Sequence, residues 1–179
     1  AEGHARASYC LGNAHAYGVG VDQDDARAAS YYEVAAAAGV PEAQSNLGLF
    51  YAQGRGAKAA YYYDKAASQG DANAMCNLAT MHSRGIGVAR DDAKATALLR
   101  RAADAGHRDG AAMLGSRYLT GAGCAQDYGE AVKWLRIAAD KGSADAQFNL
   151  GLSYHLGNGV AKDPALALDW IKKAARQGH

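Results

Sequence analysis

The sequence predicts an all-α protein, a right-handed α/α superhelical solenoid of about five helix-turn-helix repeats. Glycine recurs along all 179 residues, at Gly3, Gly39, Gly70, Gly106, Gly142 and Gly178. The intervals between these glycines are 36, 31, 36, 36 and 36 residues, and the same residue types return at the same offsets within them. Each interval has room for two short amphipathic helices. Because one helix pair cannot bury its apolar face alone, consecutive repeats are expected to stack.

The repeat at residues 142–178 shows most clearly why two helices are expected. Its first half has apolar residues at four-residue intervals, which places them on one helix face: Ala146, Leu150 and Tyr154. Gly157 and Gly159 end that helix, since glycine reaches the left-handed cap conformation without steric cost. Asp163 then caps a second helix, and Pro164 occupies its first turn, where a missing N–H costs nothing.

The other repeats follow the same plan, with expected boundaries at residues 3–38, 39–69, 70–105, 106–141 and 142–178. A leucine recurs in each first helix: Leu11, Leu47, Leu78, Leu114 and Leu150. A small residue follows it and is expected to let the two helices approach closely: Gly12, Gly48, Ala79, Gly115 and Gly151. An aspartate cap recurs before the second helix in four repeats: Asp24, Asp91, Asp127 and Asp163. We therefore expect one solenoid domain over residues 1–179, as a segment of a longer repeat array.

The second repeat departs from this plan because it is five residues short. The pair Gly54 and Gly56 is expected to end its first helix, but the linker and the aspartate cap that should follow are missing. Two explanations stay open at this point: a true deletion, or residues missing from the sequence between Gly56 and Ala57.

The recurring pattern resembles a known family. The segments Asp91–Gly106 and Gly142–Gly178 match the Sel-one-like repeat best, a relative of the tetratricopeptide repeat, and the resemblance covers essentially the whole chain. It implies a scaffold that binds other proteins in a concave groove lined by first helices. It also implies a bacterial regulatory, assembly or host-interaction setting.

Charge and hydropathy exclude two classes of function. Nineteen Lys and Arg residues balance 18 Asp and Glu residues, so the chain lacks the basic excess that a nucleic-acid-binding surface normally shows. No apolar run approaches the roughly 20 residues that span a bilayer. The sequence leaves the compartment open between the bacterial cytoplasm and the periplasm or exterior.

No constellation predicts catalysis, a metal site or a cofactor. The cysteines Cys10, Cys76 and Cys124 fall at unrelated offsets, and buried or inert thiols are expected. His15 and His82 replace a recurring tyrosine and are interpreted as packed, hydrogen-bonded side chains. A cysteine-rich branch of the family resembles these repeats and has been linked to β-lactam binding. This chain lacks its cysteine pairs, so the chain is predicted not to be an enzyme.

The candidate site is the concave face, where side chains that do not repeat between units can encode a partner. These candidates are Arg6, Tyr9, Asn13, Tyr17, Leu49, Gln53, Asn73, Arg84, Ser116, Phe148, Leu152 and His155. Exposed aromatics on a rigid scaffold suit the anchoring of a peptide or helix. For Tyr9 and Phe148, packing between adjacent helices is an equal alternative.

The leading hypothesis is therefore a non-catalytic scaffold for a partner protein. One alternative is a small-molecule- or glycan-binding, or β-lactam-hydrolysing, protein of the cysteine-rich branch. Another is a module that self-associates as a homodimer through its uncapped terminal repeats.

Overall fold

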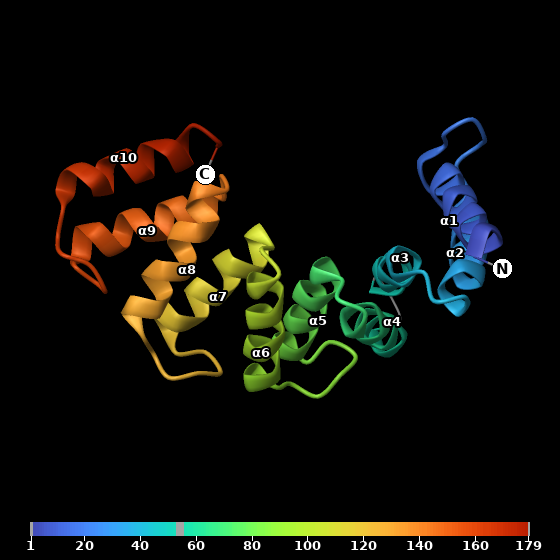
Figure 1. Ribbon diagram of the computed structural model, residues 1–179, viewed down its shortest axis with the longest axis horizontal. Coiled ribbons are helices and arrows are strands. Elements are labelled where there is room, and N and C mark those ends of the chain that lie inside the picture. The colour runs from blue at the N-terminus through green and yellow to red at the C-terminus, as the bar shows by residue number, and fades with distance from the viewer. Residues whose placement is uncertain (1, 53–55, 179) are drawn as a thin grey trace. The chain divides into compact units, whose positions relative to one another are not determined.

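The computed structural model describes residues 2–52 and 56–178, and every secondary-structure element within them is an α-helix (Figure 1). The helices of the described chain are α1 (Glu2–Tyr17), α2 (Asp25–Ala37), α3 (Pro41–Ala52), α4 (Gly56–Ser68), α5 (Ala72–Arg84), α6 (Asp92–Asp104), α7 (Arg108–Thr120), α8 (Tyr128–Asp140), α9 (Ala144–Leu156) and α10 (Pro164–Ala175). The predicted all-α solenoid of five tandem helix pairs is confirmed. None of the described helices is both long and apolar enough to cross a membrane.

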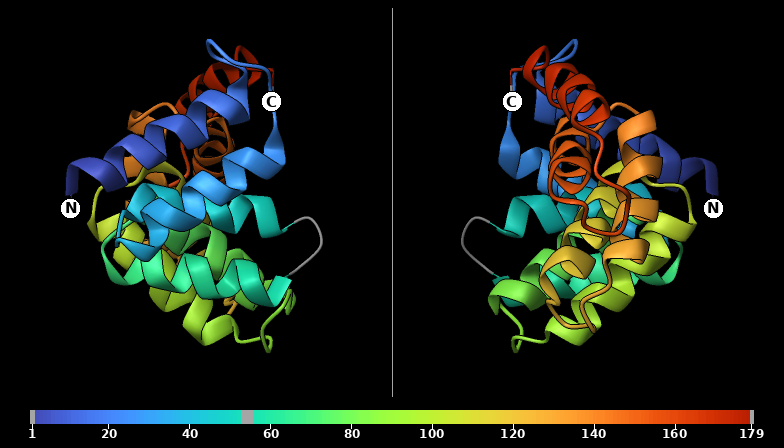
Figure 2. Two further views of the ribbon diagram at one scale, coloured as in Figure 1. Left: turned by 90° about the vertical axis from the view of Figure 1, so that its right-hand side faces the viewer. Right: turned by 90° about the vertical axis from the view of Figure 1, so that its left-hand side faces the viewer.

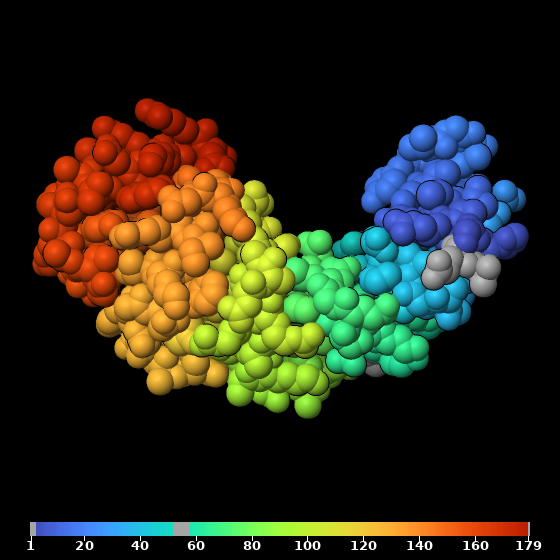
Figure 3. All heavy atoms as spheres, viewed as in Figure 1, coloured from blue at the N-terminus to red at the C-terminus, as the bar shows by residue number. Residues whose placement is uncertain are grey.

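Two compact units make up the chain, residues 1–90 with α1 to α5 and residues 91–179 with α6 to α10. Within each unit, every helix packs on its neighbours in the chain: α1 on α2, α2 on α3 and so on. Figure 2 shows such pairs side by side, and in the space-filling view of Figure 3 the colour passes from one helix to the next without a break in packing inside each unit.

Helix termini follow the capping pattern that the sequence predicts. Each predicted aspartate has an extended backbone, and its carboxylate accepts a bond from an N–H in the first turn of α2, α6, α8 or α10. The first helices α5, α7 and α9 end at a glycine in the left-handed region. Those helices also have N-caps that sequence reasoning missed: Asp71, His107 and Ser143. His107 accepts the Gly110 N–H at 3.1 Å through Nδ1.

The two helices of a repeat meet at the predicted small residue. A Cβ on Gly151 would lie 2.7 Å from Ile171 Cγ1 and 3.0 Å from the Ala167 carbonyl oxygen. On Gly48 it would lie 2.3 Å from the Tyr63 ring, closer than real Cβ contacts allow. A bulky side chain of the second helix therefore fills the space above each of these glycines, where a Cβ would overlap with it. The third repeat has alanine, Ala79, at this position.

Consecutive repeats are joined by glutamines at one repeated offset. Gln44 Nε2 donates to the Ala36 carbonyl at 3.0 Å, which satisfies a group at the end of α2, and Gln69 donates in turn to Gln44 Oε1 at 2.6 Å. Gln147 does the same for the Ala139 carbonyl of α8 at 3.1 Å. These buried amides hold α3 in register with α2, and α9 in register with α8.

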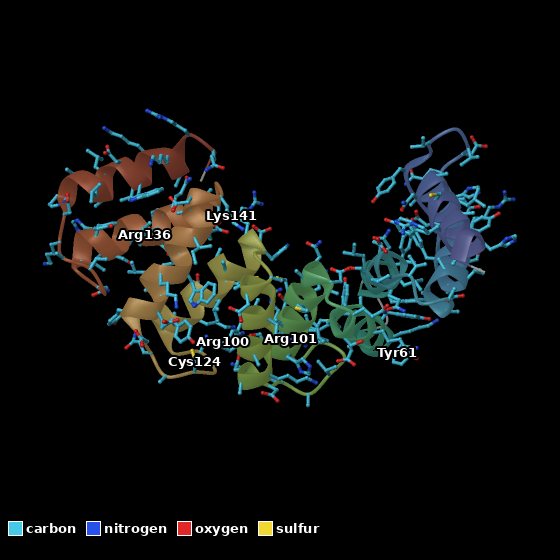
Figure 4. All side chains as sticks on the ribbon, in the orientation of Figure 1. Tyr61, Arg100, Arg101, Cys124, Arg136 and Lys141 are labelled. Atoms are coloured by element: carbon cyan, nitrogen blue, oxygen red, sulfur yellow. The ribbon has the colours of Figure 1, made fainter. Side chains whose placement is uncertain are left out.

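A second set of contacts crosses between repeats at a separation of 18 residues. In unit 2, Arg136 Nη2 donates to the Tyr154 hydroxyl at 2.6 Å, and the Arg100 guanidinium lies 5.5 Å from the centroid of the Tyr118 ring (Figure 4). In unit 1 the residue equivalent to Arg100 and Arg136 is Glu33, and here the Tyr51 hydroxyl donates to Glu33 Oε1 at 2.6 Å.

The second repeat differs from the expected pattern at its turn. Gly56 was expected as the second glycine of a helix-ending pair, but it is the first residue of α4, and Ala57 follows it within the same helix. The connection itself, residues 53–55 with Gly54, lies outside the described residues. The second helix therefore begins directly at the position where the other repeats have a linker.

The turn glycines give a prediction about packing between repeats. Gly159 has φ +73°, and a Cβ there would lie 2.2 Å from the backbone oxygen of Tyr128 in the preceding repeat. Gly157, in the same turn with φ +80°, would meet only the flexible side chain of Lys162. Both Ala substitutions incur left-handed strain, but only Gly159→Ala displaces backbone. We expect Gly159→Ala to lower the free energy of unfolding by about 1–3 kcal/mol more than Gly157→Ala, measured by urea denaturation. Equal losses would contradict this packing role.

Candidate partner-binding faces

The first-helix face of unit 1 is formed by the exposed sides of α1, α3 and α5. Tyr9 is half-buried there, with its ring centroid 6.1 Å from that of Tyr32, so part of its surface packs rather than projecting. Tyr17 is 73% exposed and Leu49 is 56% exposed. The face therefore combines a packed aromatic base with two apolar side chains open to solvent.

A group of hydrogen bonds joins α1, α2 and α3 beneath this face. The Tyr32 hydroxyl donates to Asn13 Oδ1 at 2.7 Å, and Asn46 Nδ2 donates to the same oxygen at 3.3 Å. Burial of the ring raises the pKa of Tyr32 to about 12, although hydrogen bonding with Asn46 acts in the opposite direction. The phenol therefore remains a hydrogen-bond donor at physiological pH.

The remaining predicted residues of unit 1 are spread along the face. Arg6 is exposed and borders an open hollow of about 490 Å³ with Ala5, Val40, Pro41 and Glu42. Asn73 and Arg84 are exposed at opposite ends of α5. Gln53 lies outside the described residues.

In unit 2 the first-helix face is formed by α7 and α9, and two predicted residues meet there. Ser116 and Phe148 border an open hollow of about 430 Å³, together with Ala112, Met113, Arg117, Asp145 and Asn149. Asn149 Nδ2 donates to Ser116 Oγ at 3.5 Å, and that hydroxyl donates to the Ala112 carbonyl at 3.1 Å. Phe148 is 36% exposed. The hollow thus has an aromatic wall, an amide and a carboxylate at its border.

Two other predicted residues continue along α9. Leu152 is half-buried and His155 is exposed in the last turn. Arg117 borders the hollow but is held firmly: its Nη1 donates to the carbonyls of Asp92 and Ala122 at 3.1 and 3.0 Å. Arg117 therefore supports the wall of the hollow by tying α7 to the start of α6.

Sequence reasoning missed Met113, Arg117 and Asn149 as residues of this hollow. The bond from Asn149 to Ser116 of the preceding repeat also helps to hold α9 in register with α7. A helical series of four-residue steps starting from Asp145 would have placed Asn149 on the same face. Arg117 stands where the other first helices have Ala14, Phe50, Met81 and Ser153, so the repeat pattern gave no sign of it.

The histidines and cysteines do not form a site in the described chain. His15 and His82 are buried, and each Nδ1 lies 3.4 or 3.3 Å from a loop carbonyl, of Asp22 and Ala89 respectively, as expected for packed histidines. Cys76 is buried, Cys124 is half-buried and Cys10 is exposed. Among the described residues, no three His, Cys, Asp or Glu side chains are grouped as metal ligands would be.

Charge effects in the described chain are local. The Tyr51 hydroxyl, and to a lesser extent Lys58 at 3.3 Å, hold the pKa of the Glu33 carboxyl below its usual value. Arg108 lowers the pKa of Asp109 in the same way, at 2.8 Å. Both pairs lie on exposed surface, where such interactions stabilise weakly.

Comparison with known proteins identifies the repeat. The family model for the Sel1 repeat matches residues 5–40, 41–71, 72–107, 108–143 and 144–179. The chain belongs to the Sel1-repeat family. A Sel1 repeat protein from Oxalobacter formigenes is 33% identical, with a TM-score of 0.90, over 98% of this chain and 74% of that one.

Two further solved structures are similar over nearly the whole chain. The c5321 protective antigen of uropathogenic Escherichia coli is 32% identical, with a TM-score of 0.67. The match covers 99% of this chain and 47% of the antigen. The immunity protein PA5088 of Pseudomonas aeruginosa is 26% identical, with a TM-score of 0.62, over 98% of this chain and 66% of that one. Curated protein sequences give no match. Sel1 repeats are generally protein-interaction modules and are typically non-catalytic scaffolds.

The contact between Glu33 and Tyr51 predicts a pH dependence. Because the folded state lowers the pKa of Glu33, its contribution to stability is complete above the unfolded-state pKa and is lost as the pH falls through the folded value. We expect Glu33→Gln to remove up to about 1 kcal/mol at pH 7 and progressively less from about pH 5 downward. Denaturation curves across that range measure this, with Glu42→Gln as the control. A Glu33→Gln deficit that is constant with pH would contradict the assignment.

Proposed function

We propose that this Sel1-repeat chain is a non-catalytic scaffold that binds a segment of a partner protein on its first-helix faces. The observation that carries the proposal is the hollow of unit 2. Phe148, Ser116, Asn149 and Asp145 converge there on two packed helices, and two of these residue types, the phenylalanine and the serine, do not recur at their offsets in the other repeats. Side chains that stacking does not require are free to select a partner.

Burial on these faces supports a partner rather than a substrate. The hollow is open, whereas small-molecule sites are usually enclosed clefts with converging polar groups. Unit 1 separately exposes apolar side chains on its first helices, Tyr17 and Leu49, outside any enclosed pocket. The bacterial relatives include a protective antigen and an immunity protein, which is compatible with a host-interaction or regulatory role in a bacterium.

Self-association is a second candidate, favoured by one leucine. Leu47, Leu78, Leu114 and Leu150 are at most 1% exposed, whereas the equivalent Leu11 on α1 is 44% exposed. Leu47 owes its burial to a cluster with Tyr32, Ala35 and Ala36 of the preceding α2. A second copy that offered such a surface would bury Leu11 and join two chains as homodimers.

Partner binding is tested by affinity capture from bacterial lysate with the chain and its Tyr17→Glu/Phe148→Glu variant. The control, Val34→Glu/Leu168→Glu, adds the same charge at exposed apolar positions on the second helices α2 and α10. We expect a protein that the parent and the control retain and that the first-helix variant loses, because a buried charge opposes docking. Circular dichroism checks that each variant keeps its helices. Equal capture by both variants would move the site off the first-helix faces.

Self-association is tested by the mass of the chain in sedimentation experiments over a dilution series. We expect a mass of two chains at high concentration that falls toward one, and Leu11→Glu should weaken the association at least about tenfold by placing a charge in an apolar contact. Val34→Glu is the control. A single-chain mass at every concentration would remove this candidate and leave the scaffold proposal intact.

A further inference from the structure

Three asparagines follow one another across the first helices of unit 1: Asn13 on α1, Asn46 on α3 and Asn77 on α5. All three are half-buried, on the face that the proposed function assigns to a partner. The direct bond between Asn46 Nδ2 and Asn13 Oδ1 shows that amides from successive repeats meet there. In unit 2 the corresponding position on α7 is Met113, so the row of amides is a feature of unit 1.

The hydrogen bonds fix which amide atoms remain available. Asn13 Oδ1 accepts from both the Tyr32 hydroxyl and Asn46 Nδ2, so the oxygen of this amide is used and its NH2 group is not. Asn46 uses its NH2 group, which leaves its carbonyl oxygen as an acceptor. The two amides together therefore present donors and an acceptor in fixed orientations.

Asn77 has no such partner. Asn13 bonds to Asn46 from the repeat before it, and the equivalent residue in the repeat before Asn77 is Leu49. A leucine side chain can neither donate nor accept, and the Asn77 side chain makes no hydrogen bond within the part of the chain that the structure describes. Every buried side-chain nitrogen and oxygen of the described chain is hydrogen-bonded, so solvent reaches this amide. Asn77 thus offers both its donors and its acceptor to a ligand.

We propose that this row binds the backbone of an extended, uncharged segment of a partner protein, a statement that rests on the proposed function. An extended backbone has unpaired N–H and C=O groups that match the free amide atoms, whereas a helical partner satisfies those groups internally. Packed helices are spaced by about 8–10 Å, and three residues of a polyproline II segment span about 9 Å. Asn46 and Asn77, which share one offset on α3 and α5, can therefore contact residues that are three apart in the segment, while Asn13 adds its free NH2 group beside Asn46.

The side chains around the row define the rest of the ligand. Leu49 is the equivalent of Asn13 in the next repeat, and its position is therefore beside Asn77. It is 56% exposed, so it contacts an apolar side chain of the bound segment. No member of the row is charged, so binding is expected to change little with salt concentration. The recognised segment is thus extended and apolar, read mainly through its backbone.

The test uses the full chain and a phage-displayed library of random peptides. We expect selected peptides to bind the parent and to lose about tenfold in affinity with Asn77→Leu, since one amide makes up to two hydrogen bonds of about 1 kcal/mol each. Asn77→Leu should keep the parent melting temperature within a few degrees, because its amide holds nothing in the fold. Asn158→Leu, in the turn that follows α9, makes the same replacement outside the first helices; it is the control and should leave binding unchanged.

Backbone recognition has its own signature. N-methylation of a single backbone nitrogen in a selected peptide should abolish binding at some positions where replacement of the side chain by alanine does not. Selection of no peptide, full binding by Asn77→Leu, or a bound peptide that is helical by circular dichroism would each overturn the inference. Lysate capture that depends on Phe148 but not on Asn77 would overturn it while the proposed function stands.

Discussion

The close approach of two helices at a glycine is the constraint on which the rest of this structure depends. At Gly48, Gly115 and Gly151 the second helix places a tyrosine, leucine or isoleucine where a Cβ would be. That contact sets the distance within each pair, and the pair then presents a fixed surface to its neighbours. Each pair still needs neighbours, because a leucine such as Leu47 reaches full burial only with α2 packed against it. Stability is therefore a sum over pairs and the interfaces between them.

Stacking reuses certain offsets from repeat to repeat, and this separates structural positions from functional ones. The aspartate caps recur before four second helices, the contacts 18 residues apart recur at three places, and the buried glutamines recur on two first helices. Their chemistry can vary where geometry is kept: Glu33 accepts from a tyrosine in unit 1, while Arg136 donates to one in unit 2. On the first-helix faces, by contrast, the first and fifth repeats have Tyr9 and Phe148 at a position that is serine, cysteine or alanine in the three repeats between them. Interfaces between repeats do not explain that variation, so it is available for recognition.

Sequence reasoning reached the fold because its signals are local and repeat. Asp163 before Pro164 and the glycine at 157 specify a helix start and a helix end by backbone chemistry alone, and the structure has both. It failed where a contact depends on residues from two repeats. The chain from Gln69 through Gln44 to the Ala36 carbonyl was invisible because no single repeat contains it. The hollow at Phe148 was predicted only in part for the same reason. Ser116 and Phe148 were predicted because they differ between repeats, whereas Met113 and Arg117 join them only once α7 and α9 are packed. At Gly56 the missing linker removed the local signal itself, and the helix begins there.

The asparagines show how a structural position can become a functional one without any change in that residue. Asn46 and Asn149 each donate to a polar group one repeat earlier, and this bond holds two first helices in register. Asn77 has the same position, but Leu49 replaces the polar group, so the amide is no longer needed for the register. An interface of alanines and leucines such as Ala74 and Leu78 already fixes α5 in place, and the lost bond is tolerated. An unpaired amide at the surface keeps its hydrogen-bonding capacity, and an exposed leucine beside it adds apolar area. Replacing one residue in the preceding repeat therefore converts a bond within the fold into a contact that is available to a partner.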